Sequence, residues 1–237
     1  MHVNDKKQEV VTIDNVNYSR FAIKTHVVTN KDNLFDVIKE YTVDNYQKND
    51  LLFVSEKMVA CTQNRAIPIK DIKPRRLARI LSKFVTKTSS GIGLGMPETM
   101  EMAFRETSTL RILFACVASV IGKIFRKKGW FYKVAGEKAR GIDGPCHYTL
   151  PPYNQYVVLI PNSPQKICEE ISKKFGIIVS IIDCNDLGID ILGLSSNDLY
   201  TEDMLCKILK DNPLGQSSEQ TPMGIIRKKP ITEEKVG

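Results

Sequence analysis

Several patterns that would assign a function on their own are absent from this sequence. Its six cysteines include no CxxC pair, so their spacing fits neither a zinc site nor a disulfide framework. The glycine-rich stretch GIGLG at residues 91–95 lacks the Lys-Ser/Thr of a P-loop and departs from GxGxxG, which makes it a weak nucleotide signal. Any functional site must therefore be built from less familiar elements.

The sequence also has no long hydrophobic run. Residues 112–125 are almost all apolar, but a spanning helix needs about 20 such residues, so we expect this stretch to be buried core. Basic residues are not clustered with aromatic ones, which argues against nucleic-acid binding. The N-terminal residues are polar and do not resemble a secretory signal. We expect a cytoplasmic protein without membrane or nucleic-acid partners.

The composition is that of an ordinary globular protein. Of 237 residues, 42% are hydrophobic and 26% are charged, so the chain is long enough for one large or two modest domains. The formal net charge is +7, which suits an anionic ligand such as a nucleotide or phosphate.

Hydrophobic periodicity predicts an α+β fold with mixed sheets and packed helices. We expect a polar N-terminal arm at residues 1–19, which adds at most an edge strand, one α+β domain at residues 20–229, and a tail at residues 230–237. No linker marks a boundary between subdomains. The predicted strands are residues 20–29, 51–54, 130–134, 156–160, 177–182, 189–194 and 223–227, and the predicted helices begin near residues 33, 74, 97, 164 and 197.

Three loops rich in Gly, Asp and Asn follow or precede these strands. The first is the turn GIDGP at residues 141–145, which contains Asp143; the second is IIDCNDLG, with Asp183 and Asp186; the third is DNPLGQSSEQTP at residues 211–222. Loops of this kind on a rigid scaffold are typical of a binding site. Asp143 is either a metal or phosphate ligand or a structural turn residue, and two acids at a buried strand end are costly unless paired or bound to a cation.

The order of these landmarks resembles the coenzyme F420-0:L-glutamate ligase (F420-0 γ-glutamyl ligase) family. The resemblance extends from THVVT at residues 25–29 through LLFVSEKMVACTQNR at residues 51–65, the GID turn and IIDCND to the late polar loop. It implies the γ-glutamyl ligase-like fold and a GTP-dependent amide ligase that works with Mg²⁺ or Mn²⁺ as a homodimer. GTP phosphorylates a small-molecule carboxylate, and the amine of an amino acid such as L-glutamate attacks the acyl phosphate.

The resemblance also implies which residues form the site. Asp143 and Asp183 fall at catalytic, metal-binding positions, and Asp186 and Gln216 are further candidate metal ligands. The positions that correspond to nucleotide contacts are His26, Val27, Val28, Thr29, Ser55, Glu56, Lys57, Gly215, Gln216 and Glu219.

This sequence departs from the family pattern at several positions. Cys61 occupies the place of a second lysine, Cys146 the place of an asparagine after GID, and VAG replaces NAG. These departures leave a second function open, in which a non-catalytic nucleotide- or cofactor-binding protein keeps the same scaffold. We also expect part of residues 112–125 to form the homodimer interface.

Overall fold

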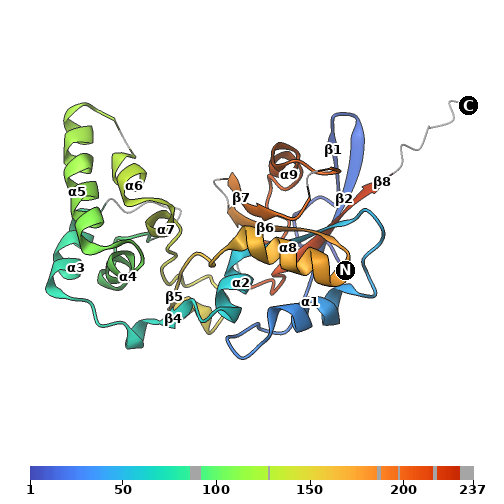
Figure 1. Cartoon of the computed structure of the whole chain (residues 1–237), viewed down its shortest axis with the longest axis horizontal. Helices are drawn as coiled ribbons and strands as arrows, with labels where there is room; N and C mark the ends of the chain where they lie inside the picture. The colour runs from blue at the N-terminus through green and yellow to red at the C-terminus, as the bar shows by residue number, and fades with distance from the viewer. Residues whose placement is uncertain (86–91, 128, 186–187, 197, 216–217, 230–237) are drawn as a thin grey trace, which may run out of the picture. The chain divides into compact units, whose positions relative to one another are not determined.

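A computed structural model describes residues 1–85, 92–127, 129–185, 188–196, 198–215 and 218–229 (Figure 1). They form two compact units: unit 1 contains Met1–Gln63 and Pro161–Gly237, and unit 2 is Asn64–Ile160. The predicted α+β class is confirmed. The expected tail at residues 230–237 lies outside the described residues.

Unit 1 is built on a six-stranded mixed sheet with the order β1-β2-β8-β3-β6-β7. The strands are β1 (Val10–Ile13), β2 (Val16–Ile23), β3 (Leu51–Ser55), β6 (Ile178–Asn185), β7 (Gly188–Leu194) and β8 (Met223–Lys229). β3 pairs in parallel with β6, and the other neighbours are antiparallel. The expected N-terminal arm therefore includes an edge strand, β1, and the first part of β2.

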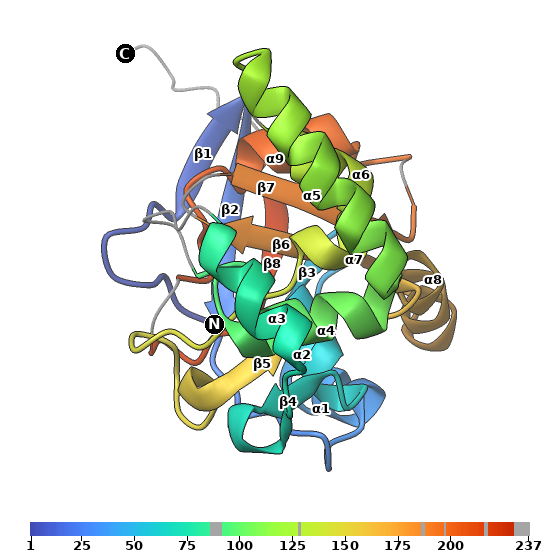
Figure 2. The ribbon, with the colours of Figure 1, turned by 90° about the vertical axis from the view of Figure 1, so that its left-hand side faces the viewer.

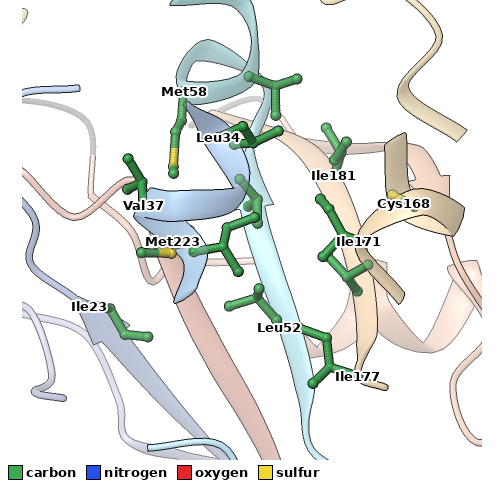
Figure 3. Close-up of a cluster of buried hydrophobic side chains, with 14 of the residues drawn as sticks. Ile23, Leu34, Val37, Leu52, Met58, Cys168, Ile171, Ile177, Ile181 and Met223 are labelled. Carbon is green, nitrogen blue, oxygen red and sulfur yellow. The ribbon is translucent and has the colours of Figure 1, made fainter. Parts of the chain in front are cut away.

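The side chains of β3 alternate between two hydrophobic cores, one on each face of the sheet. Leu52 and Val54 point into a core shared with helices α1 (Leu34–Thr42), α2 (Glu56–Thr62) and α8 (Pro164–Phe175), part of which is shown in Figure 3. Leu51 and Phe53 point into the opposite core, which α9 (Glu202–Ile208) covers. All four strand residues are fully buried, so β3 is the centre of unit 1.

Local signals in the sequence set the helix ends of unit 1. The Asn33 side chain caps α1 by accepting hydrogen bonds from the backbone N–H groups of Phe35 and Asp36, and Thr201 caps α9 in the same manner. Pro164 begins α8, and Gly176, in the left-handed region at φ +69°, ends it. The predicted starts of α1 and α8 agree with the structure, whereas the helix predicted to begin near residue 197 begins only at Glu202, after the Thr201 cap.

An ion pair between a buried arginine and a solvent-exposed aspartate fixes the chain that leads out of α9. Arg20, on β2, is 1% exposed and forms an ion pair with Asp211. Its guanidinium also donates to the carbonyl oxygens of Ile208, at 2.9 Å, and Gln8, at 2.5 Å. Burial acts to raise the pKa of Asp211, but the hydrogen bond and charge of Arg20 outweigh it, so this pKa is lowered.

Unit 2 is mainly helical. Its helices are α3 (Arg76–Leu81), α4 (Pro97–Thr107), α5 (Thr109–Ile124), α6 (Trp130–Ala135) and α7 (Glu137–Arg140), together with a short antiparallel pair, β4 (Ala66–Pro68) and β5 (Tyr156–Val158). The short 3₁₀ turns are Ile69–Asp71 and Ser82–Phe84 in the first part of this unit and Tyr153–Gln155 before β5. Figure 2 shows α3, α4 and α5 from one side of the unit.

The core of unit 2 lies between these helices and includes Met100, Ala103 and Phe104 of α4. Glu101 on the same helix is 3% exposed. Burial acts to raise its pKa, but hydrogen bonds and charge from Arg75, with a further hydrogen bond from Arg105, lower it overall. The buried carboxylate thus ties α4 to the residue that precedes α3.

The prediction of a strand at residues 130–134 is wrong, because this segment forms helix α6. Its aromatic and β-branched residues favour a strand, but Gly129 at φ +84° and Gly136 at φ +89° turn the chain at both ends. Tertiary contact then decides the outcome, since Trp130 packs against Gly122 of α5, where a Cβ would lie within 3.0 Å of the indole.

The expectation that residues 112–125 are buried core is also wrong for most of the segment. Helix α5 buries Ile112, Ala115 and Gly122, while Phe114 is 67% exposed and Ile124 is 73% exposed. Only one side of α5 packs against the rest of unit 2. The exposed side is also apolar, so the composition of the segment does not show which side faces solvent. Within the described residues, no single helix is long and apolar enough to cross a membrane, although α4 and α5 meet the criterion as a pair bent by 115°.

The Arg20–Asp211 pair leads to a test of stability. Replacing Asp211→Asn keeps an oxygen acceptor but removes the charge opposite the buried guanidinium. Because the Asp211 side chain is 44% exposed and water screens it, we expect a loss of about 1 kcal/mol in the free energy of unfolding at pH 7. The folded pKa of Asp211 is lowered. Its contribution is therefore complete above the ordinary value of about 3.9 and is lost as the pH falls through the folded pKa.

Urea unfolding of both proteins at a series of pH values measures this difference. The gap between wild type and variant narrows under acidic conditions if the ion pair is responsible. A gap that does not change with pH would show that the carboxylate charge contributes nothing.

Candidate functional site

The register of the sheet gathers several chain segments at one edge. Ser55, the last residue of β3, pairs with Ile182 of β6, and Met223, the first residue of β8, pairs with both Val54 and Ile23. The segments that follow β2 and β3, the end of β6 and the loop before β8 therefore meet there. We call this the loop edge.

The segment after β2 is held in a compact arrangement around Asp32. The Asp32 carboxylate accepts hydrogen bonds from the backbone N–H of Thr29 at 2.7 Å and from its hydroxyl at 2.9 Å, and it lies 3.2 Å from Nε2 of His26. The hydrogen bond from the Thr29 backbone is the largest cause of a lowered pKa for Asp32. Nδ1 of His26 lies 3.0 Å from the Tyr41 hydroxyl, so both ring nitrogens have partners.

Of the four predicted residues in this segment, His26 is exposed, Val27 and Thr29 are half-buried and Val28 is buried. The backbone of Thr25 bonds to Gln220 in the late loop. The Thr25 N–H donates to the Gln220 carbonyl at 3.2 Å, and the Gln220 amide donates to the Thr25 carbonyl at 2.5 Å. The first and last predicted segments therefore contact each other directly.

The segment after β3 enters helix α2. The Ser55 side chain caps this helix by accepting a hydrogen bond from the Lys57 backbone N–H, and the Ser55 N–H donates to the carbonyl of Pro222. Glu56 is 5% exposed, while Lys57 is exposed to solvent. Cys61 lies on the buried side of α2, also 5% exposed. A lysine at position 61 would thus enter the core of unit 1.

Asp183 lies near the end of β6 and faces a second acid across the sheet. It is the direct cross-strand partner of Asp190 on β7, and directly opposed residues of antiparallel strands have their side chains on the same face. Asp183 is half-buried and Asp190 is exposed. Asp186 lies outside the described residues. Sequence reasoning did not find Asp190, because only the register of the β6–β7 hairpin places it opposite Asp183.

The late loop is folded by hydrogen bonds from two buried asparagines. The Asn212 amide donates to the carbonyls of Gly215, at 2.9 Å, and Cys184, at 3.3 Å, which joins the loop to the end of β6. Gly215 has φ +77°, and a Cβ on it would overlap the Glu219 carboxyl group. Glycine is therefore required at this position, and Glu219 lies against its backbone. Gln216 lies outside the part of the chain that the structure describes.

The second asparagine, Asn4, comes from the N-terminal segment. Its amide donates to the carbonyl of Pro213 and to the hydroxyl of Thr221, both at 2.9 Å, and Thr221 in turn donates to the Leu214 carbonyl at 2.7 Å. Lys7 adds a contact to the backbone of Asp211 at 2.5 Å. The first residues of the chain therefore fix the late loop. A lone Asn in a polar segment gives no signal of this in the sequence.

Asp143 belongs to unit 2. Its backbone N–H and carbonyl both pair with Val158 at 2.9 Å, forming an isolated bridge. Ile142 beside it is 2% exposed, and a Cβ on Gly141 would overlap the Ile160 side chain. Gly141 is thus required for close packing, and the Asp143 carboxylate is presented by a rigid backbone. Cys146 is half-buried.

The structure thus brings together the predicted residues of unit 1 at the loop edge. These are His26, Val27, Val28, Thr29, Ser55, Glu56, Lys57, Asp183, Gly215 and Glu219. Asp143 lies in the other unit, so its association with Asp183 stays a prediction.

The comparisons with known proteins agree with the order of these landmarks. The model of the F420-0:gamma-glutamyl ligase family matches residues 22–182. This range includes the segments after β2 and β3, the GID turn and β6 as far as Ile182, and it ends before Asp183 and the late loop. The chain therefore belongs to the F420-0:gamma-glutamyl ligase family and is an enzyme of the ligase class. A search of curated proteins gave no match.

The role of Asn4 can be tested by two substitutions. Asn4→Ala removes two buried hydrogen bonds, and we expect it to lower the free energy of unfolding by about 1–2 kcal/mol. Asn4→Asp has nearly the same shape, but it places a carboxylate against the Pro213 carbonyl, so we expect a larger loss. Urea unfolding measures both values, and hydrogen exchange locates the change to residues 211–221. If Asn4→Asp is as stable as wild type, the amide does not hold the loop.

Proposed function

We propose that the protein is a GTP-dependent amide ligase that joins an amino acid such as L-glutamate to a carboxylate acceptor such as F420-0. The observation that carries this proposal is the loop edge. Family membership points to γ-glutamyl ligase activity, and one edge of the sheet gathers the segments in which the resemblance expects nucleotide contacts.

The proposed reaction has two steps. An oxygen of the acceptor carboxylate attacks the γ-phosphorus of GTP, the bond to the β-phosphate oxygen breaks, and GDP leaves. The amine of the amino acid then attacks the carbonyl carbon of the acyl phosphate, loses a proton and expels phosphate. Because phosphoryl transfer depends on positioning and on neutralising charge, the protein must hold the phosphates firmly and present positive charge to them.

The loop edge offers groups that suit these tasks. Lys57 is an exposed ammonium at the start of α2, beside the Ser55 side chain that caps the helix. The backbone at Gly215, where φ is +77°, holds the Glu219 carboxyl group close against it, next to the loop edge. His26 is oriented by Asp32 and Tyr41, which suits a positioning contact to the nucleotide better than a proton transfer, since both ring nitrogens are engaged.

A divalent cation would fit beside the Asp183–Asp190 pair. Mg²⁺ in phosphate-transfer sites is held by one or two carboxylates together with the phosphates of the substrate, and the cross-strand pair supplies two carboxylates on one face. Within the described ranges, no group of three or more His, Cys, Asp or Glu forms a complete protein cage. When bound, the cation neutralises charge that develops on the transferred phosphoryl group. By the resemblance, Asp143 is a further ligand.

The alternative is a nucleotide- or cofactor-binding protein without turnover, and the burial of Cys61 favours it. The resemblance expects a second basic residue at this position, but the Cys61 side chain lies in the core of unit 1, where it contributes no charge to a phosphate. The retained acids at Asp143 and Asp183 favour catalysis, because a protein that only binds nucleotide has less need of metal-binding carboxylates.

Metal binding by Asp183 and Asp190, the acidic pair, predicts that divalent cations stabilise the folded protein. We expect Mn²⁺ or Mg²⁺ to raise the melting temperature of the wild-type protein, because a ligand that binds the folded state stabilises it by mass action. Asp183→Asn and Asp190→Asn should each reduce this increase. Asp14→Asn is the matched control, since Asp14 lies in the β1–β2 turn at φ +49°, a conformation that Asn accepts. An equal increase in all four proteins would exclude a cation at the acidic pair.

Catalysis is tested most simply at Asp143. Asp143→Asn keeps the shape of the turn and its bridge to Val158 but removes the negative charge. We expect about a 10–100-fold loss of cation-dependent GTP turnover with a nearly unchanged melting temperature in the absence of metal. Steady-state GDP release, measured with acceptor and amino acid present, gives the activity, and calorimetry gives the melting temperature.

Asp14→Asn again serves as the control and should keep full activity. If Asp143→Asn retains full cation-dependent turnover, Asp143 is a structural turn residue. A wild-type protein that binds GTP tightly without releasing GDP would instead support the non-catalytic alternative.

A further inference from the structure

Helix α5 in unit 2 exposes an apolar stripe along its length. The stripe consists of Leu110, Phe114, Val117, Ile121 and Ile124, whose spacing of four and three residues places them on one side of the helix. Leu110 is 68% exposed, and each of the other four is at least 40% exposed. Isolated apolar residues on a surface are common, but a continuous row of large ones indicates an interaction site.

The inner side of α5 is packed against the core of unit 2. Ile112 and Ala115 are fully buried in the core of unit 2, and Gly122 allows the helix to approach Trp130 and the Lys127 carbonyl closely. The stripe is therefore not the core-facing side of a misplaced helix, because the opposite side of α5 already packs into the core of unit 2.

A second exposed apolar site lies at α3 and the turn that follows it. Ile80 is 54% exposed and Phe84 is 75% exposed. Figures 1 and 2 show α3 and α5 on the same side of unit 2.

Positive charge surrounds these apolar residues in the sequence. Residues 107–136 contain six Lys and Arg and no Asp or Glu, and residues 72–97 also contain six Lys and Arg and no Asp or Glu. Unit 2 as a whole has 17 basic and 6 acidic residues, a formal charge of +11, whereas the rest of the chain has 17 basic and 21 acidic residues, a charge of −4. The net basicity of the protein thus resides in the unit that carries the stripe.

The basic residues at the end of α5 lie beside the stripe. Lys123, Arg126 and Lys127 are exposed, next in sequence to Ile124 and Phe125, of which Phe125 is 65% exposed. A helix with large apolar residues on one side and Lys or Arg at its margin is typical of a segment that lies in the interface of a membrane.

The combination of exposed apolar residues and positive charge indicates which kind of partner binds the stripe. A second copy of the chain, the partner expected at residues 112–125 from the sequence, would bring the same positive charge to the contact, which opposes association through this stripe. Nucleic acid would satisfy the charge but leave the aliphatic side chains in water. An anionic lipid surface satisfies both, since the headgroups attract the basic residues and the acyl boundary accepts the stripe.

We propose that unit 2 docks on the surface of an anionic lipid bilayer through the exposed stripe of α5. The helix lies in the plane of the interface. At 16 residues it extends about 24 Å, which is shorter than a hydrocarbon core of about 30 Å. This proposal is independent of the proposed ligase reaction, because none of its residues belongs to the loop edge or to the GID turn.

Co-sedimentation of the whole protein with vesicles tests the proposal. The vesicles consist of equimolar phosphatidylcholine and phosphatidylglycerol in one arm and of phosphatidylcholine alone in the other. We expect binding to the anionic vesicles, weaker binding as the salt concentration rises, and at least about tenfold weaker binding to the neutral vesicles. Equal binding to both lipids, or no binding to either, overturns the proposal.

Two double variants distinguish vesicle binding through the stripe from nonspecific binding by exposed apolar residues. Phe114→Ser with Ile124→Ser removes exposed apolar surface from the stripe, and we expect at least about a tenfold loss of vesicle binding. Val43→Ser with Leu199→Ser is the matched control, because Val43 and Leu199 are also exposed, 59% and 50%, but lie in unit 1. It should bind as wild type does. Circular dichroism melting checks that both variants remain folded.

Light scattering without lipid tests the alternative that a second copy of the chain covers the stripe. A dimer of wild type that becomes a monomer in the Phe114→Ser, Ile124→Ser variant, together with no vesicle binding, would assign the stripe to self-association and overturn the lipid proposal. Vesicle binding that the stripe variant retains in full would overturn it as well.

Discussion

The position of β3 in the middle of the sheet is the constraint on which the rest of unit 1 depends. Its four buried residues alternate between two cores, so any change of register by one residue would exchange the two sets of side chains between faces. The parallel pairing with β6 and the antiparallel pairing with β8 are fixed by the same alternation. Gly224 on β8 permits this packing, because a Cβ there would overlap the Phe53 ring.

The loop edge follows from that register, but its loops are shaped by hydrogen bonds that cross long distances in the sequence. Asn4 and Arg20 near the N-terminus hold the loop that precedes β8, and Asn212 joins that loop to the end of β6. Each of these polar side chains is buried and is therefore costly unless it is bonded. A polar site that is fixed in this way needs little reorganisation when a charged ligand arrives, which is what phosphoryl transfer requires.

The sequence predicts those features that depend on neighbouring residues. The Asn33 cap and the Pro164 start give the ends of two helices, and the apolar run of β3 gives a buried strand. The order of the glycine- and acid-rich loops indicates the family. By contrast, residues 130–134 have the composition of a strand and form a helix, because contact with α5 and two flanking glycines outweigh the propensity.

The sequence does not predict features that depend on the pairing of strands or on the exposure of side chains at the surface. Asp190 becomes a candidate ligand only through its place opposite Asp183, and the bonds of Asn4 join residues more than two hundred positions apart. The apolar run of α5 reads as core because composition does not distinguish a helix buried on all sides from one that is packed on one side. The charge of unit 2 emerges only once its boundaries at residues 64 and 160 are known.

The proposed ligase reaction depends on activation of a carboxylate by transfer of a phosphoryl group, and one isotope experiment tests this step directly. The acceptor is supplied with ¹⁸O in its carboxylate, together with GTP, L-glutamate and a divalent cation, and the released phosphate is analysed by mass spectrometry. The acyl-phosphate reaction predicts one ¹⁸O atom in each phosphate released, because the bond that forms to phosphorus comes from the carboxylate. Phosphate released without ¹⁸O would show that water attacks GTP, and it would contradict the assignment of ligase chemistry through an acyl phosphate.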